Sequence, residues 1–219
     1  MTFSILAFDP ISKAFGGASA TGNICVGGWV LRADPRYGIS ATQGAEVSTL
    51  WGEDVIKIMS EGENAKDAIL KTIENDPRKD FRQLAAIDIK GNSNSFDGKL
   101  NETFTGSYSE KNLVISGNTL KNQEVISAMH AGFKLHQKEF PEKLICALYK
   151  GFGAGGDIRG VQSTALLIVS LNHPPINLRV DYSLNPLVDL EKLYQKVLDK
   201  KYKTWLKSLP IRSLDRDHK

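Results

Sequence analysis

The sequence predicts an α+β protein in which two mainly antiparallel β-sheets pack face to face, with pairs of helices outside them. Segments with strand character and segments with helical periodicity come in blocks along the 219 residues, which argues against a repeating βαβ chain. Apolar residues make up 41% and charged residues 24%, which is ordinary for a globular protein. No proline-rich linker or internal repeat divides the chain, so we expect one domain over residues 1–198 and a basic tail over 199–219.

The first block predicts four strands. Residues 3–8 form a short apolar run that ends at an Asp-Pro turn signal. Residues 14–21 are small and glycine-rich, which is typical of a strand that another backbone or a ligand approaches closely. Residues 28–33 and 37–43 predict two more short strands around a second Asp-Pro turn.

After the predicted strand over 37–43, the spacing of apolar residues changes from that of strands to that of helices. Apolar residues at helical spacing predict helices over 50–59 and 65–73, and the second helix stops before an Asp-Pro pair. A strand over 82–89 is followed by Lys90-Gly91-Asn92, a hairpin signal that leads into a strand over 93–96.

The remaining elements follow the same two periodicities. Strands are expected over 103–108 and 113–116, and helical spacing returns at 125–133 and 144–148. A glycine-rich loop spans 151–160. The most apolar run, 163–171, predicts a central strand with 177–181 as its partner, and 187–202 predicts an amphipathic helix.

Charge and composition exclude several functional classes. The net charge is +3, but residues 199–219 hold seven basic and three acidic residues and carry +4, so the other 198 residues carry −1. A near-neutral body gives no reason to expect nucleic-acid binding. No segment is long and apolar enough to span a membrane, and the N-terminal run lacks the basic flank of a secretory signal. We therefore expect a cytoplasmic protein.

No metal site or cofactor is expected from the sequence. The two cysteines, Cys25 and Cys146, are far apart and are expected to be small buried side chains in a reducing compartment. None of the four histidines has metal-binding spacing.

The glycine-rich loop contains Gly151-Phe-Gly153-Ala-Gly155-Gly156, which satisfies the dinucleotide pattern G-x-G-x-x-G. That pattern must follow a strand and open a helix, whereas here a helix precedes it and a strand follows, so a nucleotide site is not expected. Two interpretations stay open: the backbone N–H groups of the loop bind an anion or an oxyanion, or the glycines only permit an unusual turn.

The polar stretch after these glycines is more informative. Asp157, Arg159 and Gln162 lie between flexible glycines and a very apolar strand. Arg159 could hold a substrate carboxylate, and Asp157 could fix a ligand amine. Alternatively, the two residues form an ion pair that ties down the loop.

Thr2 is the candidate nucleophile. Its side chain is small, so removal of Met1 would leave a threonine whose free α-amine and hydroxyl supply base and nucleophile on one residue. An α-amine has a pKa of about 8, so it is partly neutral at cellular pH. Thr2 also opens a predicted core strand directly, which would hold both groups rigidly. The alternative is an ordinary protein that begins with Met-Thr.

Several motifs together resemble a known family. They are Thr2-Phe-Ser-Ile-Leu-Ala-Phe-Asp9, Gly16-Gly-Ala-Ser-Ala20, Ala41-Thr-Gln43, Gly117-Asn118 and Gly155-Gly-Asp-Ile-Arg-Gly-Val-Gln-Ser163. They resemble, over about residues 2–190, the family called domain of unknown function 1028, assigned to the N-terminal-nucleophile (Ntn) hydrolase superfamily.

The resemblance implies a four-layer αββα sandwich and hydrolysis of an amide by an N-terminal nucleophile, here Thr2. It places six further residues around the site: Thr42, Gln43, Asn118, Asp157, Arg159 and Gln162. The segment Glu46-Val-Ser-Thr-Leu-Trp-Gly52 and the basic tail depart from the family pattern.

Two functions are compatible with these residues. The first is an amide hydrolase of small molecules, with Thr2, Gln43, Asn118 and Asp157 in catalysis and Thr42, Arg159 and Gln162 in substrate binding. The second is a non-catalytic protein that binds a small ligand on the same fold. The superfamily often assembles, so a homo-oligomer is also expected.

Overall fold

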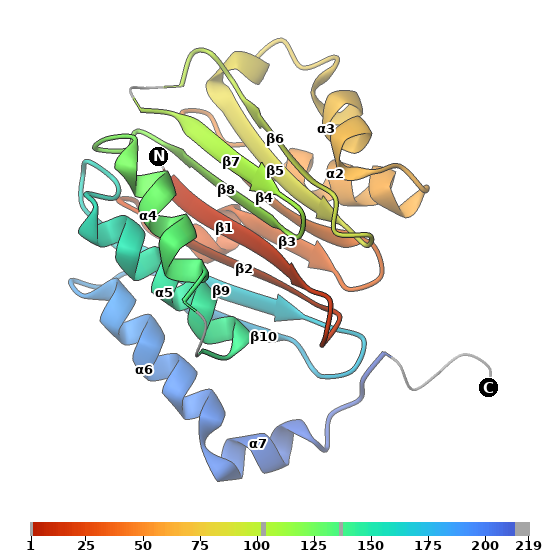
Figure 1. Ribbon diagram of the computed structural model, residues 1–219, viewed down its shortest axis with the longest axis vertical. Coiled ribbons are helices and arrows are strands. Elements are labelled where there is room, and N and C mark those ends of the chain that lie inside the picture. Colours follow the sequence, from red (N-terminus) through yellow and green to blue (C-terminus); the bar gives the residue numbers. More distant parts are fainter. Residues whose placement is uncertain (1, 102–103, 136–137, 213–219) are drawn as a thin grey trace.

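The computed structural model of the chain describes residues 2–101, 104–135 and 138–212. These residues form four layers, in which two β-sheets pack face to face and helices cover the outer face of each (Figure 1). The predicted α+β sandwich is thus confirmed. Met1, residue 103 of a predicted strand and residues 213–219 of the predicted tail lie outside the described residues.

The larger sheet has six strands in the order β10-β9-β2-β1-β8-β7, and all neighbours are antiparallel. They are β1 (Thr2–Asp9), β2 (Ala14–Thr21), β7 (Gly106–Glu110), β8 (Leu113–Asn118), β9 (Ser163–Val169) and β10 (Ile176–Val180). The smaller antiparallel sheet has the order β3-β4-β5-β6. Its strands are β3 (Leu31–Asp34), β4 (Gly38–Gly44), β5 (Arg82–Asp88) and β6 (Ser93–Asp97).

Helices form the outer layers. The larger sheet is covered by α4 (Glu124–Phe133), α5 (Phe140–Gly153) and α6 (Pro186–Leu198). The smaller sheet is covered by α2 (Thr49–Ser60) and α3 (Ala65–Ile73). Three short elements complete the described chain: α1 (Val26–Trp29), α7 (Lys200–Leu206) and a 3₁₀ turn, η1 (Lys79–Phe81). Among the described residues, no helix combines the length and apolar character needed to cross a bilayer.

Strand β1 distributes its side chains between two layers. Phe3 is fully buried against the helices, in one cluster with Leu144 of α5. Leu6 is fully buried between the sheets, in one cluster with Ile39 of β4. Because side chains alternate along a strand, Thr2 shares the inter-sheet face with Leu6. The alternation therefore places the candidate nucleophile between the sheets, away from the helices.

The glycines of β2 permit close packing on both faces of the larger sheet. A Cβ at Gly16 would lie 2.6 Å from Leu144 Cδ1 and 2.7 Å from Phe140 Cε1, so α5 could not sit as close to the strand. A Cβ at Gly17 would lie 3.0 Å from Leu31 Cδ2 in the smaller sheet. We expected another backbone or a ligand to approach this strand, whereas at Gly16 and Gly17 the close approach is made by side chains, including those of α5 and β3.

Two predicted elements differ from the structure. The strand expected over 28–33 is the helix α1 followed by β3, because the backbone N–H of Val26 donates to Ser163 Oγ (3.1 Å) and starts a helical turn there. The helix expected over 187–202 is broken at Asp199, whose carboxylate accepts from the backbone N–H of Lys201 (2.8 Å) and caps α7. In addition, Gly151 and Gly153 close α5, so the glycine-rich loop begins at Ala154.

Candidate active site

A pocket of about 600 Å³ opens where β1, β2 and β4 meet at one end of the two sheets. Its polar lining consists of Thr2, Thr21, Asn23, Gln43 and Arg159. Its apolar lining consists of Ile24, Cys25, Val26, Trp29, Val30, Gly44, Ala45 and Val47. This volume suits a small-molecule ligand.

Thr2 lies at the edge of this pocket on the first residue of β1, with 5% of its surface exposed. Its hydroxyl donates to Thr21 Oγ1 (3.3 Å), at the end of β2. Thr21 Oγ1 also accepts from the backbone N–H of Asn23 (3.3 Å). We did not predict Thr21 as a site residue, although a polar residue that closes a glycine-rich strand is a usable signal. The Thr2 hydroxyl is thus held in one position, facing the pocket.

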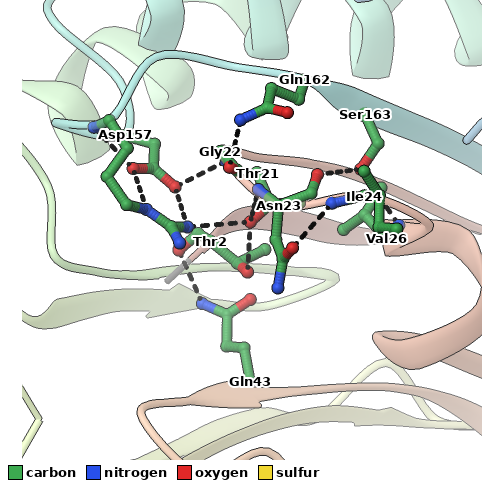
Figure 2. Close-up of polar contacts among 11 residues, drawn as sticks. Thr2, Thr21, Gly22, Asn23, Ile24, Val26, Gln43, Asp157, Gln162 and Ser163 are labelled. Carbon is green, nitrogen blue, oxygen red and sulfur yellow. Dashed lines mark hydrogen bonds and ion pairs between the residues drawn. The ribbon is translucent and has the colours of Figure 1, made fainter. Parts of the chain in front are cut away.

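Gln43 reaches Thr2 from the opposite sheet, as Figure 2 shows. Its Nε2 donates to the carbonyl oxygen of Thr2 (3.2 Å) and to Gln83 Oε1 (2.6 Å), and its Oε1 accepts from Ser4 Oγ (2.8 Å). An amide nitrogen has two N–H groups, and both are used. Gln43 therefore fixes the backbone of Thr2 and has no remaining N–H for a ligand.

Gln83 of β5, which is fully buried, determines the orientation of the amides around Thr2. Its Nε2 faces only acceptors, namely Asp97 Oδ1 (2.6 Å) and the carbonyl oxygens of Gly106 (3.2 Å) and Gly117 (3.1 Å). Its Oε1 must therefore face the other way, where it accepts from Gln43 and from Asn118 Nδ2 (3.2 Å). We did not predict this residue; the only sequence signal is a polar side chain at the start of an apolar strand.

Asn118 is the cross-strand partner of Thr2 in the β1–β8 ladder and is fully buried. Its Nδ2 is bonded to Gln83, and its Oδ1 has no hydrogen-bond partner among the described residues. A buried acceptor without a partner costs free energy, so the side of Asn118 next to Thr2 has capacity for one more donor.

Asp157 and Arg159 form the ion pair that one reading of the loop predicted. The Asp157 carboxylate, which has no exposed side-chain surface, accepts from the backbone N–H of Gly22 (2.7 Å) and lies 2.8 Å from Arg159 Nη2. It also accepts from the backbone N–H of Arg159 (2.9 Å) and from its Nε (3.1 Å). The Asp157 oxygens are therefore turned toward the protein, whereas Arg159, one-third exposed, lines the pocket beside Thr21 (Nη2 to Oγ1, 3.5 Å).

Gln162 and Thr42 do not line the pocket. Gln162 Nε2 donates to the carbonyl oxygen of Gly22 (2.9 Å), so it supports the segment after β2. Thr42 points to the opposite face of β4 from Gln43, toward α2, where its Cγ2 lies 3.1 Å from the place a Cβ would occupy on Gly52. Strand alternation is the reason, because neighbouring residues of β4 cannot both face the pocket.

Within the described part of the chain, no group of three or more His, Cys, Asp or Glu side chains is placed to hold a metal ion. The chemistry available in the pocket is that of hydroxyls, amides, one guanidinium group and the free thiol of Cys25, which is partly exposed.

Replacing Gln83 by methionine should destabilise the protein and disturb the site together. The N–H groups of Gln43 and Asn118 and an Asp97 oxygen would lose a buried partner. We expect the free energy of unfolding, measured by urea denaturation, to fall by about 2–3 kcal/mol. Gln195→Met, on the exposed face of α6, is the matched control and should change it by less than about 0.5 kcal/mol. Equal stability of the two variants would contradict the role given to Gln83.

Comparison with known proteins identifies a family and a fold. The sequence model of a family of unknown function, DUF1028, matches residues 2–190. The crystal structure of protein SPO2555 from Silicibacter pomeroyi, of the same family, is 42% identical to this chain. It superimposes with a TM-score of 0.93 and covers 97% of this chain and 96% of that one.

A more distant structure shows the fold alone. The crystal structure of eukaryotic HslV from Trypanosoma brucei is 11% identical and superimposes with a TM-score of 0.51, covering 77% of this chain and 99% of that chain. HslV has the Ntn-hydrolase fold, so the present chain is Ntn-hydrolase-like in architecture. No curated protein matches the sequence.

Proposed function

This chain belongs to the DUF1028 family, and on that premise we propose that it is an Ntn-type hydrolase of a small-molecule amide with Thr2 as nucleophile. The observation that carries the proposal is the position of the Thr2 hydroxyl, which is fixed by Thr21 and faces a pocket of ligand size. Removal of Met1 would add an α-amine to the same residue.

The reaction needs only groups of Thr2, the substrate and water. The neutral α-amine takes the hydroxyl proton as Thr2 Oγ1 attacks the amide carbonyl. When the tetrahedral intermediate collapses, the C–N bond breaks and the α-ammonium group of Thr2 transfers its proton to the leaving amine nitrogen. A water molecule, deprotonated by the α-amine, then attacks the Thr2 ester. The carboxylic acid is released and the proton returns to Oγ1.

Asn23 is the side chain best placed to stabilise the oxyanion. It is exposed and lines the pocket next to Thr21. Its Oδ1 accepts from the backbone N–H of Ile24 (2.9 Å), which fixes the orientation of the amide and turns Nδ2 outward. From the sequence we placed Gln43 and Asn118 in catalysis, but both N–H groups of Gln43 are used within the protein and Asn118 is fully buried. We propose that Gln43 and Asn118 position Thr2 and that Asn23 donates to the oxyanion.

Asn23→Ala should lower kcat by about 10²–10³-fold, the usual cost of losing one oxyanion donor. KM should change little, because the interaction develops only in the transition state. The measurement is steady-state kinetics on any amide that the wild-type protein hydrolyses. Asn23→Asp, which keeps the acceptor for Ile24 but not the donor, should be as slow as Asn23→Ala. A fast Asn23→Asp variant would remove this residue from the mechanism.

Met1 should be absent from the active protein. Intact-mass measurement of protein isolated from its native host should show a chain that begins at Thr2, since only then is the α-amine available as a base. Full retention of Met1 in protein from the native host would refute the proposed mechanism and favour the alternative, a protein that binds its ligand without cleaving it.

Cytoplasmic location and assembly into a homo-oligomer are parts of the same proposal. Size-exclusion chromatography with light scattering tests the second part directly, and a monomer at micromolar concentration would contradict it.

A further inference from the structure

The pocket has two ends of different chemistry, with Thr2 between them. Arg159 is the only charged residue among its described lining residues. In Figure 2, Thr2 lies between Asp157, the partner of Arg159, and Ile24 and Val26. A molecule whose reacting bond lies at Thr2 therefore extends toward a cation on one side and toward apolar side chains on the other.

The cationic end is close to the nucleophile. Thr21 Oγ1 lies 3.3 Å from Thr2 Oγ1 and 3.5 Å from Arg159 Nη2, so the guanidinium lies no farther than two hydrogen-bond lengths from the attacking oxygen. Asp157 holds the guanidinium from the protein side, through Nε and Nη2. The guanidinium is thus fixed in place with its exposed part directed to the pocket.

This short distance limits where a substrate anion can be. The attacked carbonyl carbon lies roughly 3 Å from the nucleophile, and a carboxylate oxygen lies roughly 2.8 Å from an arginine nitrogen. Little distance therefore remains between the attacked carbonyl carbon and the carboxylate oxygen. A carboxylate separated from the amide by one carbon lies two bonds of about 1.5 Å from the attacked carbon when that one carbon is bonded to the carbonyl, and three bonds when it is bonded to the amide nitrogen. Both spans fit this interval when the groups are not collinear. A chain with two more methylene groups would carry the carboxylate past Arg159.

The apolar end is formed by the segment that follows β2. Ile24 is 52% and Trp29 is 51% exposed, whereas Val26 and Val30 are buried beneath them. Val47 contributes from the segment after β4. Large apolar side chains exposed together at the wall of a pocket are typical of a binding site for an apolar group.

We infer that the substrate is an amide with an apolar arm on one side and a carboxylate one carbon from the amide on the other. N-acyl α-amino acids have this chemistry, and so do N-alkyl malonamates, in which the amide is reversed. The inference rests on the proposed function in placing the amide at Thr2, but it concerns binding and can be tested without turnover.

The first test is calorimetric binding to the Thr2→Ala protein, with its N-terminus checked by mass. N-octanoylglycine should bind at least about tenfold more tightly than N-octanoylglycinamide, which has a similar shape but a neutral carboxamide in place of the carboxylate, because a charge-assisted hydrogen bond is lost. It should also bind at least about tenfold more tightly than N-acetylglycine, which lacks the apolar arm. N-octanoyl-4-aminobutyrate, with its carboxylate two carbons farther away, should be weaker. N-octylmalonamate carries the reversed amide, so comparing its binding with that of N-octanoylglycine shows which orientation of the amide the pocket prefers.

Four variants in the same Thr2→Ala background connect these preferences to Arg159 and Trp29. Arg159→Gln should abolish the preference for the acid over its amide, and Arg159→Lys should retain part of it. The double variant Asp157→Asn with Arg159→Gln removes both charges of the pair. It controls for misfolding of Arg159→Gln alone, in which Asp157 is left without its counter-ion. Trp29→Ala, at a half-exposed position, should weaken N-octanoylglycine but leave N-acetylglycine unchanged.

The outcomes separate this inference from the proposed function. Binding with these preferences, but no hydrolysis by the wild-type protein, supports the substrate class and refutes the hydrolase. Hydrolysis of amides without preference for the acid or the apolar arm refutes the substrate class and leaves the hydrolase. Equal binding of N-octanoylglycine and N-octanoylglycinamide, or no binding of any probe, overturns the inference.

Discussion

Thr2→Ala should lose several orders of magnitude in kcat, and Thr2→Ser should retain part of the rate. Alanine and serine both permit removal of Met1, so both variants have a free α-amine. Only serine keeps a hydroxyl on the same atom, and without it the covalent route no longer exists. The measurement is the single-turnover rate on an amide that the wild-type protein hydrolyses.

Stability provides the control for this pair of variants. Among the described residues the Thr2 hydroxyl makes one hydrogen bond, to Thr21, so its loss should lower the free energy of unfolding by only about 1 kcal/mol. A large loss of activity with a small loss of stability therefore indicates chemistry. If Thr2→Ala hydrolyses a confirmed substrate as fast as the wild-type protein, Thr2 has no role in the mechanism.

Asp157→Ala should destabilise the protein by about 3 kcal/mol and also lower its activity. The fully buried carboxylate is the acceptor for Gly22 and the counter-ion of Arg159, and removal of one partner of a buried pair typically costs about 3–5 kcal/mol. We expect the lower end because Arg159 is one-third exposed and water can replace part of the interaction. Urea denaturation measures the change.

Two comparison variants show whether burial is the reason. Asp157→Asn keeps an oxygen for the Gly22 N–H and should lose about 1–2 kcal/mol. Asp181→Ala breaks a pair of the same spacing, Arg179–Asp181, in which both side chains are exposed. It should change stability by less than about 1 kcal/mol. If Asp157→Ala and Asp181→Ala destabilise equally, the Asp157 pair is not a structural anchor.

The local sequence pattern was sufficient to predict most of the helices and strands. The apolar runs over 3–8 and 82–89 and the helical spacing over 65–73 reflect burial in the core, which the sequence encodes directly. The prediction was wrong over 28–33, where the Ser163 hydroxyl, 137 residues away from Val26, starts the helix α1. A contact between residues so far apart in the sequence leaves no pattern in the sequence around either residue.

The candidate site likewise combines features that the local sequence indicates with features that it does not. An ion pair was one of the two interpretations of Asp157-x-Arg159, whose residues are close in the chain, and the pair is present. The family resemblance did not distinguish Gln43, which contacts Thr2, from Thr42, which faces α2. Which face of a strand is turned toward the pocket depends on how the two sheets pack against each other. The catalytic and binding roles of these residues stay predictions.

The sequence by itself determined the α+β class, the family, and the placement of Thr2 at the start of a buried strand, because these follow from periodicity and motif. Only the tertiary structure decided which groups surround Thr2. Thr21, Asn23, Gln43 and Gln83 come from three strands and a loop in two different sheets. Their hydrogen bonds depend on the register and separation of those sheets, which arise from the burial of the whole core. No short segment of the chain specifies them.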